Sequence, residues 1–460
     1  MRILLITYSY SPAVNPRALR WSEIAGYWAK QGHQVDVVAA WFPGAARKES
    51  LGGVNVFRVG GALFERARML FSQGTGNRVP RDAQSGHVGR RQDDALRRIA
   101  KRIHDHTWKL VYWPDYAVPW YFAARRQTRR CLAEKRYDAM ITVSLPFSAH
   151  LAGYWVKRRY PALTWLVDVG DPFCFMDQTP PNNQMLYARL NVATERRIFS
   201  TADAISVTTE GTRDRYAAMF PESAARIVVI PPLLSRHASA APGAVLPRDE
   251  KIRLVFIGTL YRAIRSPDFL LRLFARLRHE AFGERLELHF FGQIEDCERS
   301  FTPYETLLGQ ALVVHGRVPP AMARQAMREA DILVNIGNAT SYQLPSKLVE
   351  YVSAGKRILN IAMIPEDAST RFLREYPWAL SLCRRDGEPD DAMYARLVEF
   401  VARNIDEETA GKAREEWSRR FDVEAIAPMY DAMLVKPETR FRPDRETRTP
   451  RAADAGTRLD

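Results

Sequence analysis

Short runs of β-branched and other apolar residues alternate with amphipathic stretches over the first 235 residues. The strand-like runs are Ile3 to Thr7, Gln34 to Ala39, Val54 to Val59, Ala139 to Val143, Thr164 to Asp168, Ala204 to Thr208 and Ile227 to Ile230. The helix-like stretches are Arg17 to Gln31, Ser148 to Tyr160 and Met185 to Ser200. This alternation predicts a parallel sheet covered by helices.

A second block of the same kind follows a proline-containing connector. Its strand-like runs are Arg253 to Ile257, Leu286 to Phe291, Leu312 to His315, Ile332 to Asn335 and Arg357 to Ile361, and its helix-like stretches are Pro267 to Leu277, Pro320 to Glu329 and Pro345 to Ser353. The 460 residues also exceed the roughly 250 to 300 that one core supports. We therefore predict an α/β protein of two tandem Rossmann-like domains, at 1–235 and 250–405. Helices follow at 406–434, and residues 436–460 are polar without apolar periodicity, which predicts a disordered tail.

Positive charge is concentrated in one segment of the first domain, the basic aromatic insertion at about 62–136. From Glu65 to Arg136 there are 17 Lys and Arg against 7 Asp and Glu, interleaved with aromatic side chains. This composition suits an anionic membrane surface. A solvated helix face with its aromatics in the core explains it equally well. No recognisable nucleic-acid module accompanies the charge, so we expect no nucleic-acid partner.

The cysteines and the apolar runs bear on the compartment. The four cysteines lie far apart, without a CxxC pair or metal-ligand spacing, which predicts free thiols in a reducing compartment. The opening run Met1 to Thr7 is short and predicts a strand rather than a signal peptide. No apolar run approaches the ~20 residues of a membrane span. We expect a cytoplasmic protein, with the insertion as a candidate for peripheral membrane contact.

The segment after Ile332 to Asn335 has the features of a ligand site. A loop follows the strand, Pro345 suits the first turn of a helix, and the start of a helix can bind a diphosphate. Lys347 and Glu350 are three residues apart and share one face of that helix. A carboxylate in this position can accept hydrogen bonds from ribose hydroxyls. An ordinary surface ion pair is the alternative, and the spacing alone favours it.

Residues Leu344 to Lys356, LPSKLVEYVSAGK, resemble the donor-site helix of family-four glycosyltransferases of GT-B fold, especially the polysaccharide-synthesis branch. Further segments resemble landmarks of that branch in the same order, over roughly residues 1 to 434. They are Ser144 to His150, Asp168 to Phe173, Ile257 to Pro267, Phe290 to Gly292, His315 to Pro319 and Glu329 to Leu333.

The resemblance implies a retaining sugar transfer in a cleft between the domains, from a nucleotide-sugar to a glycan or lipid-linked acceptor. It implies neither a cofactor nor a bound metal, and it implies that the helices at 406–434 return to the first domain. The leaving diphosphate gathers negative charge, which cations can stabilise. The implied catalytic residues are His150, Arg262, Arg265 and Lys347. The implied donor-binding residues are Gly258, Thr259, Arg262, Arg265, Tyr342, Ser346, Lys347 and Glu350.

Three further residues are candidates on the acceptor side. Arg17 and Arg20 suit an anionic acceptor such as a lipid-linked diphosphate, although a solvated helix face explains them nearly as well. Asp171 is either acceptor-facing or a turn former before Pro172. His150 is a candidate for contact with sugar hydroxyls, but a lone histidine at a helix start is more often structural.

Three positions depart from the pattern of the branch. Tyr342 stands where a glutamate commonly contacts the transferred sugar, Thr259 replaces the arginine of the usual Gly-Arg pair, and Gly170 replaces the arginine of Arg-Asp-Pro. Two other functions therefore stay open. One is a catalytically silent scaffold or nucleotide-binding protein, and the other is a sugar-nucleotide epimerase on the same fold.

Overall fold

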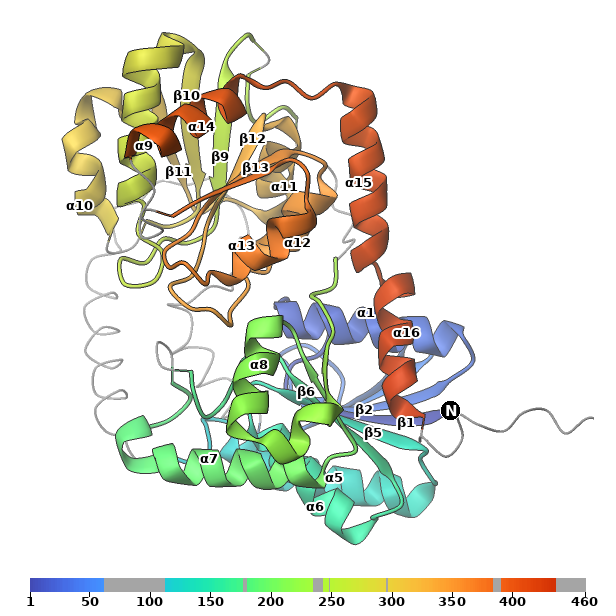
Figure 1. Cartoon of the computed structure of the whole chain (residues 1–460). Coiled ribbons are helices and arrows are strands. Elements are labelled where there is room, and N and C mark those ends of the chain that lie inside the picture. Colours follow the sequence, from blue (N-terminus) through green and yellow to red (C-terminus); the bar gives the residue numbers. More distant parts are fainter. Residues whose placement is uncertain are drawn as a thin grey trace, which may run out of the picture.

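The computed structural model describes residues 1–61, 112–176, 180–234, 243–247, 249–294, 297–383 and 390–435. They form two α/β domains, each built on a largely parallel sheet (Figure 1). The predicted fold class of two Rossmann-like domains is confirmed. Most of the insertion, at 62–111, and the tail at 436–460 lie outside the described residues.

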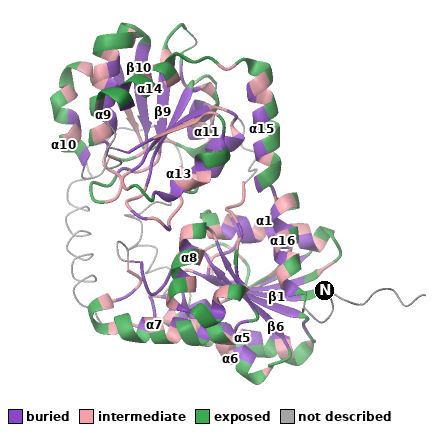
Figure 2. Ribbon diagram, viewed as in Figure 1, coloured by how far each residue is buried: buried purple, intermediate pink, exposed green. Residues whose placement is uncertain are grey.

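The first sheet has the order β3-β4-β2-β1-β5-β6-β7-β8. Its strands are β1 (Arg2–Thr7), β2 (Gln34–Ala40), β3 (Lys48–Leu51), β4 (Val54–Val59), β5 (Ala139–Ser144), β6 (Thr164–Val169), β7 (Ala204–Val207) and β8 (Ile227–Val229). All neighbours pair in parallel except β3 and β4. The central strands β5 and β6 are buried along their whole length, as Figure 2 shows, which explains why most of their residues are apolar.

Helices cover both faces of the first sheet. One face packs on α1 (Pro16–Lys30) and α16 (Val423–Leu434). The other packs on α5 (Val118–Glu134), α6 (Ser148–Arg159), α7 (Gln184–Thr201) and α8 (Glu210–Met219). The start of α1 is fixed locally, because the Asn15 side chain accepts a hydrogen bond from the Ala18 amide at 3.0 Å and Pro16 follows the cap.

The second sheet has the order β11-β10-β9-β12-β13-β14 and is parallel throughout. Its strands are β9 (Ile252–Ile257), β10 (Leu286–Phe291), β11 (Leu312–Gly316), β12 (Ile332–Ile336), β13 (Arg357–Ile361) and β14 (Ala379–Leu382). Its helices are α9 (Asp268–Leu277), α10 (Glu298–Phe301), α11 (Pro320–Glu329), α12 (Lys347–Ser353), α13 (Ala368–Phe372) and α14 (Asp390–Ala402). Short 3₁₀ or π turns are Pro221–Arg226, Arg278–Phe282, Gly283–Arg285, Thr302–Leu307 and Leu373–Glu375.

The chain returns to the first domain at its carboxyl end. Helix α15 (Glu407–Phe421) packs beside α12, and α16 packs on α1, so the two red helices in Figure 1 run from one domain to the other. Asp422 separates them and caps α16 by accepting from the Ala425 amide at 3.2 Å. The Leu234 amide donates to the Phe421 carbonyl at 2.7 Å, which ties the outgoing connector to the returning helix.

The four cysteines are buried free thiols, as predicted. None of the described helices combines the length and the apolar character that a bilayer crossing requires.

Candidate functional site

Two loops meet at the carboxyl edge of the second sheet, the β9 loop (residues 258–267) and the β12 loop (residues 337–346). Arg265 Nη2 donates to Asn338 Oδ1 at 2.8 Å, and the Ala339 amide donates to the Ile264 carbonyl at 3.1 Å. Open α/β sheets bind ligands at this edge. The structure thus brings together the two segments that carry most of the predicted donor-binding residues.

The beginning of the β9 loop lies against the end of β10. The Gly258 amide donates to the Phe291 carbonyl at 2.9 Å. A side chain at Gly292, where φ is 141°, would collide with the Gly258 carbonyl. Gly292 therefore permits a close backbone approach that no larger residue allows. The predicted role of Gly258 in approaching a ligand stays a prediction.

Helix α12 begins beside these loops and carries the predicted pair. Lys347 Nζ lies 2.8 and 2.9 Å from the two carboxylate oxygens of Glu350, and the side chains are 38% and 29% exposed. Both groups are thus accessible to a ligand. The capping residue Ser346 makes no side-chain hydrogen bond to the first turn. Tyr351 Oη accepts from the Ile257 amide at 3.0 Å and fixes the helix to the end of β9. No local pattern predicts this contact, because the two residues are 94 positions apart in the chain.

The two arginines of the β9 loop have different surroundings. Arg265 is largely enclosed, and its Nη1 lies 3.4 Å from the Thr259 carbonyl in addition to the bond to Asn338. Burial lowers the pKa of its guanidinium. Arg262 is exposed on the same loop. Of the two arginines predicted to face the diphosphate, Arg265 braces the loops, whereas Arg262 lies at the surface.

Tyr342 lies at the contact between the domains rather than over the predicted donor site. Its ring packs edge-on against Phe175 of the first domain, with centroids 5.2 Å apart, and the residue is 4% exposed. Its carbonyl accepts hydrogen bonds from the hydroxyls of Thr209 and Thr212, at 2.8 and 3.0 Å. The interpretation of its side chain as donor-binding is therefore corrected, because the ring is part of the core of the first domain.

The N-terminal end of α8 forms the first-domain side of this contact. A side chain at Gly211 would collide with the Ser341 carbonyl of the β12 loop. On the outer side, Arg371 Nη1 lies 3.2 Å from Asp214 Oδ2. A pocket of about 390 Å³ lies between the domains here, with both Gly211 and Arg371 in its lining. Neither Lys347 nor Glu350 lines this pocket, so it is separate from the predicted donor site.

Two of the predicted acceptor-side residues lie together. Arg17 Nη2 is 3.7 Å from Asp171 Oδ2, and Gln343 of the β12 loop donates to Asp171 Oδ1 at 3.4 Å. A side chain at Gly170 would collide with the Arg17 guanidinium. Arg17 therefore occupies the space that a side chain at position 170 would need. A cation is present beside Asp171 although the sequence lacks the Arg-Asp-Pro of the branch.

Arg20 does not share this surface. It is 5% exposed, and its Nη2 and Nη1 donate to Tyr430 Oη and to the Pro231 carbonyl, both at 2.7 Å. The residue joins α1, the connector and α16. The prediction that Arg20 faces an acceptor is corrected, because its guanidinium is buried between these elements.

His150 lies in the first turn of α6 and points into the core of the first domain. It is fully enclosed, and its Nδ1 lies 2.8 Å from the Thr142 hydroxyl. Burial lowers the pKa of the ring to about 3, with Asp168 acting in the opposite direction. A neutral, enclosed imidazole does not reach a sugar. The structural alternative fits His150, and its proposed contact with substrate is corrected.

The buried imidazole of His150 predicts a loss of stability in acid. Its folded pKa of about 3 lies below its ordinary value of 6.5, so the unfolded chain binds the proton first as the pH falls. The contribution of the neutral ring to the free energy of unfolding is complete above pH 6.5 and declines as the pH falls to about 3. At about pH 4.5 it is lower by about 2 to 3 kcal/mol. Urea unfolding of the wild type and of His150→Gln at several pH values measures this slope. The exposed His279→Gln variant serves as the control and is expected to keep the wild-type slope.

Comparison with known proteins identifies the type of chain. Residues 18–232 match the family described as glycosyl transferase 4-like domain. Most of the first domain therefore matches a glycosyl transferase 4-like domain, and the chain as a whole has the GT-B fold. Its sequence matches no curated protein significantly.

Three solved structures share the fold over nearly the whole length of this chain. The catalytic domain of starch synthase IV from Arabidopsis thaliana, bound to ADP and acarbose, has a TM-score of 0.59 at 8% identity, covering 94% of this chain and 98% of that one. OtsA in its apo form has a TM-score of 0.59 at 12% identity, covering 95% and 99%. WaaG, a glycosyltransferase involved in lipopolysaccharide biosynthesis, has a TM-score of 0.50 at 11% identity, covering 94% and 99%. At these identities the similarity concerns the fold.

Proposed function

We propose that this glycosyltransferase moves a sugar, with retention of configuration, from a nucleotide-sugar to a lipid-linked or polysaccharide acceptor in cell-surface glycan synthesis. The observation that carries the proposal is the accessible pair of Lys347 and Glu350 at the start of α12, beside the joined β9 and β12 loops. In the absence of a ligand the two side chains neutralise each other. A nucleotide would separate them and give each a new partner.

The Glu350 carboxylate would accept hydrogen bonds from the two ribose hydroxyls. Tyr351, fixed to β9 through the Ile257 amide, prevents the first turn of α12 from moving with the ligand. Each hydrogen bond to a charged group contributes about 1.5 to 3 kcal/mol, and separating Glu350 from Lys347 offsets part of this, so we expect a net gain of about 2 to 3 kcal/mol. Lys347, released from Glu350, would then face the diphosphate.

Cations near the diphosphate would favour the chemical step. The bond between the anomeric carbon and the diphosphate oxygen breaks, and its electron pair stays on the leaving diphosphate. The acceptor hydroxyl oxygen forms the new bond to the anomeric carbon, on the face that the diphosphate leaves, and its proton passes to the leaving diphosphate. Lys347 and the exposed Arg262 would stabilise the charge that develops on the leaving group, whereas Arg265 would act indirectly by holding the two loops together.

Arg17 and Asp171 form the proposed acceptor side, because they lie next to each other and Asp171 contacts Gln343 of the donor domain. A cation at this position suits an acceptor that carries a diphosphate. A cytoplasmic location and a reaction without cofactor or metal stay predictions.

Nucleotide binding tests the donor site most directly. In a thermal-shift screen of UDP, GDP, dTDP and CMP, with and without attached sugars, at least one nucleotide is expected to stabilise the wild type. At a concentration about 100 times Kd the stabilisation is about 2.7 kcal/mol. Glu350→Ala is expected to weaken the binding of that nucleotide roughly 30- to 150-fold, because the two ribose hydrogen bonds are lost.

Glu408→Ala is the matched control. Glu408 also pairs with a lysine on a helix, Lys412 at 2.6 Å, but it lies on α15 and is 77% exposed. It is expected to bind nucleotide as the wild type does. If no nucleotide stabilises the wild type, or if Glu350→Ala binds as tightly as Glu408→Ala, the donor-site assignment is wrong.

A catalytically silent, nucleotide-binding GT-B protein is the second candidate. It is favoured by Tyr342, since the position where the branch commonly has a sugar-contacting glutamate carries a ring that packs against Phe175. Such a protein would bind nucleotide with the same dependence on Glu350. Release of nucleoside diphosphate in the presence of a lipid-linked acceptor distinguishes the two, because a silent protein releases none.

A further inference from the structure

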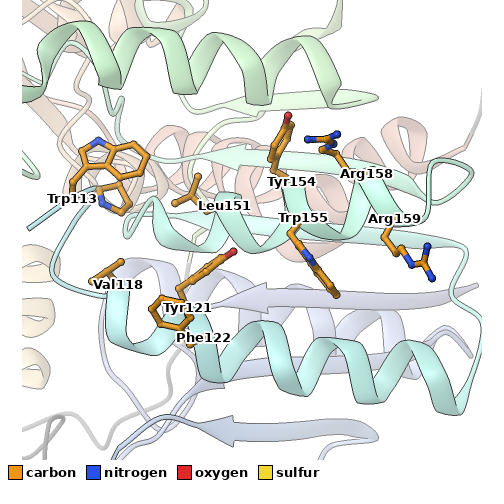
Figure 3. Close-up of a pocket in the computed structure, with 10 residues that line it drawn as sticks. Trp113, Val118, Tyr121, Phe122, Leu151, Tyr154, Trp155, Arg158 and Arg159 are labelled. Carbon is orange, nitrogen blue, oxygen red and sulfur yellow. The ribbon is translucent and has the colours of Figure 1, made fainter.

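An open groove of about 610 Å³ runs between α5 and α6 on the outer surface of the first domain (Figure 3). Its walls are mostly apolar and aromatic, with Tyr121 and Phe122 from α5 and Leu151 and Trp155 from α6. Phe122 is 65% exposed. Aromatic side chains of this size are normally buried, so an exposed aromatic groove marks a binding surface.

The borders of the groove are positively charged. The Arg125 guanidinium lies 4.5 Å from the centre of the Trp155 ring, and Arg158 and Arg159 line one end of the groove. The three helices α5, α6 and α7 together carry ten Lys and Arg residues. Two of these are matched by carboxylates outside the helices, because the buried Lys157 pairs with Asp203 and Arg196 pairs with Glu222. The only acidic residues within the three helices are Glu134 and the buried Glu195. The partner of this surface must therefore be anionic.

A second apolar patch lies at the start of α7, next to the groove. Met185, Leu186 and Leu190 are 100%, 62% and 45% exposed. The groove is connected to α7 through Trp113, which lines one end and donates from Nε1 to Asn191 Oδ1 at 3.0 Å. Helix α6 also packs against α7. The α5–α7 surface thus combines exposed apolar side chains with arginines over three adjacent helices.

We propose that the α5–α7 surface docks on an anionic phospholipid bilayer, with an acyl chain entering the α5–α6 groove. Arginines bind headgroup phosphates, and tryptophan and tyrosine favour the interface between headgroups and acyl chains. An acidic protein partner would match the charge of the surface, but its carboxylates would not suit the apolar walls of the α5–α6 groove. A bilayer supplies both the phosphates and the chains.

The docking also gives the proposed reaction access to a lipid-borne acceptor. Helices α5 and α6 begin at the carboxyl edge of the first sheet, where Asp115 joins them by accepting from the Ala117 and Ser148 amides, both at 2.9 Å. Arg17 and Asp171 lie at that same edge. Membrane binding itself does not depend on sugar transfer, so the two proposals succeed or fail separately.

Co-sedimentation of the full chain with vesicles tests the proposal. The wild type is expected to bind phosphatidylcholine vesicles that contain phosphatidylglycerol, to bind pure phosphatidylcholine weakly, and to lose binding as salt is raised. Each arginine near an anionic surface contributes roughly fivefold to binding, so the double variant Arg158→Glu/Arg159→Glu is expected to lose at least roughly 25-fold. Phe122→Ser is expected to lose roughly tenfold, through lost burial of the ring.

The double variant Lys412→Glu/Arg419→Glu on α15 is the matched control. It changes the net charge equally, and its side chains are 75% and 72% exposed, so it is expected to bind vesicles as the wild type does. Equal binding by the two double variants would overturn the proposal. So would equal binding of the wild type to neutral and anionic vesicles, or binding to a lipid-linked diphosphate in detergent without binding to vesicles.

Occupation of the groove has its own readout. Lipids brominated along the acyl chain quench tryptophan fluorescence only at close range. The wild type on anionic vesicles is expected to be quenched more than Trp155→Phe, because Trp155 lines the groove. Equal quenching of the two proteins would show that no acyl chain enters the groove.

Discussion

Replacing Gly211 with alanine is expected to separate the two domains at their contact and to slow sugar transfer by roughly 10- to 100-fold. Gly211 lies in the first turn of α8, and the added methyl group would collide with the Ser341 carbonyl. That carbonyl belongs to the backbone and cannot turn aside as a side chain would. The hydrogen bonds from Thr209 and Thr212 to the Tyr342 carbonyl would be strained or lost with it.

The expected loss of activity arises from geometry and not from unfolding. Alanine forms helix better than glycine, so the substitution stabilises α8 itself by about 0.5 to 1 kcal/mol. Gly411→Ala on α15 is the matched control, because a side chain there meets no atom within 4 Å. Small-angle scattering is expected to show a larger radius of gyration for Gly211→Ala only. An unchanged radius together with unchanged turnover would show that this contact does not set the arrangement of the domains.

The sequence pattern predicts most reliably the strands that are buried on both faces of a sheet. Strands β5, β6, β9 and β10 lie inside parallel sheets covered on both faces, so their sequences are mostly apolar, with single buried polar residues such as Asp168 in β6 and Arg253 in β9. The pattern missed two of the four edge strands. Strand β3 has the sequence KESL and strand β14 has ALSL, and neither has a β-branched residue. The other edge strands, β8 and β11, carry the β-branched runs IVV and LVV and were predicted.

The donor site could be predicted in part because its main pair is local. Lys347 and Glu350 are three residues apart on one helix, and a helix places such residues together. The contacts of Arg265 and Tyr342 join segments that are far apart in the chain. Arg265 reaches Asn338 across 73 residues, and Tyr342 meets Thr209 across 133. No local pattern carries that information.

Arg17 and Arg20 illustrate the same limit within one helix. They are three residues apart and were predicted to act together. Arg17, at the start of α1, extends over Gly170 toward Asp171, whereas Arg20 is buried against Tyr430, 410 residues away. The difference arises because α16 covers the second turn of α1 and not the first. The path of the returning chain therefore decides which of the two arginines is buried.

The carboxylate of Asp168 is expected to hold this returning chain in place, and Asp168→Ala is expected to destabilise the first domain by about 3 to 5 kcal/mol. Asp168 is buried in β6 and accepts hydrogen bonds from Trp21 of α1, Ser206 of β7 and Tyr430 of α16, at 3.0, 2.7 and 2.9 Å. Tyr430 in turn accepts from the buried guanidinium of Arg20. Removing the carboxylate leaves the buried donors of Trp21, Ser206 and Tyr430 without this acceptor.

Asp171→Ala is the matched control, because it also removes an aspartate but not the buried carboxylate of Asp168. Asp171 follows three residues later, but its side chain is 42% exposed and its ion pair with Arg17 is 3.7 Å long. Exposed pairs of this kind contribute at most about 1 kcal/mol. Urea unfolding gives the two free energies, and hydrogen exchange in α16 locates the loss. Since a domain is stable by only about 5 to 15 kcal/mol, Asp168→Ala is expected to release α16 well before the sheet unfolds. Equal stability of the two variants would mean that packing of the Trp21 and Tyr430 rings, and not the carboxylate, joins α16 to the first domain.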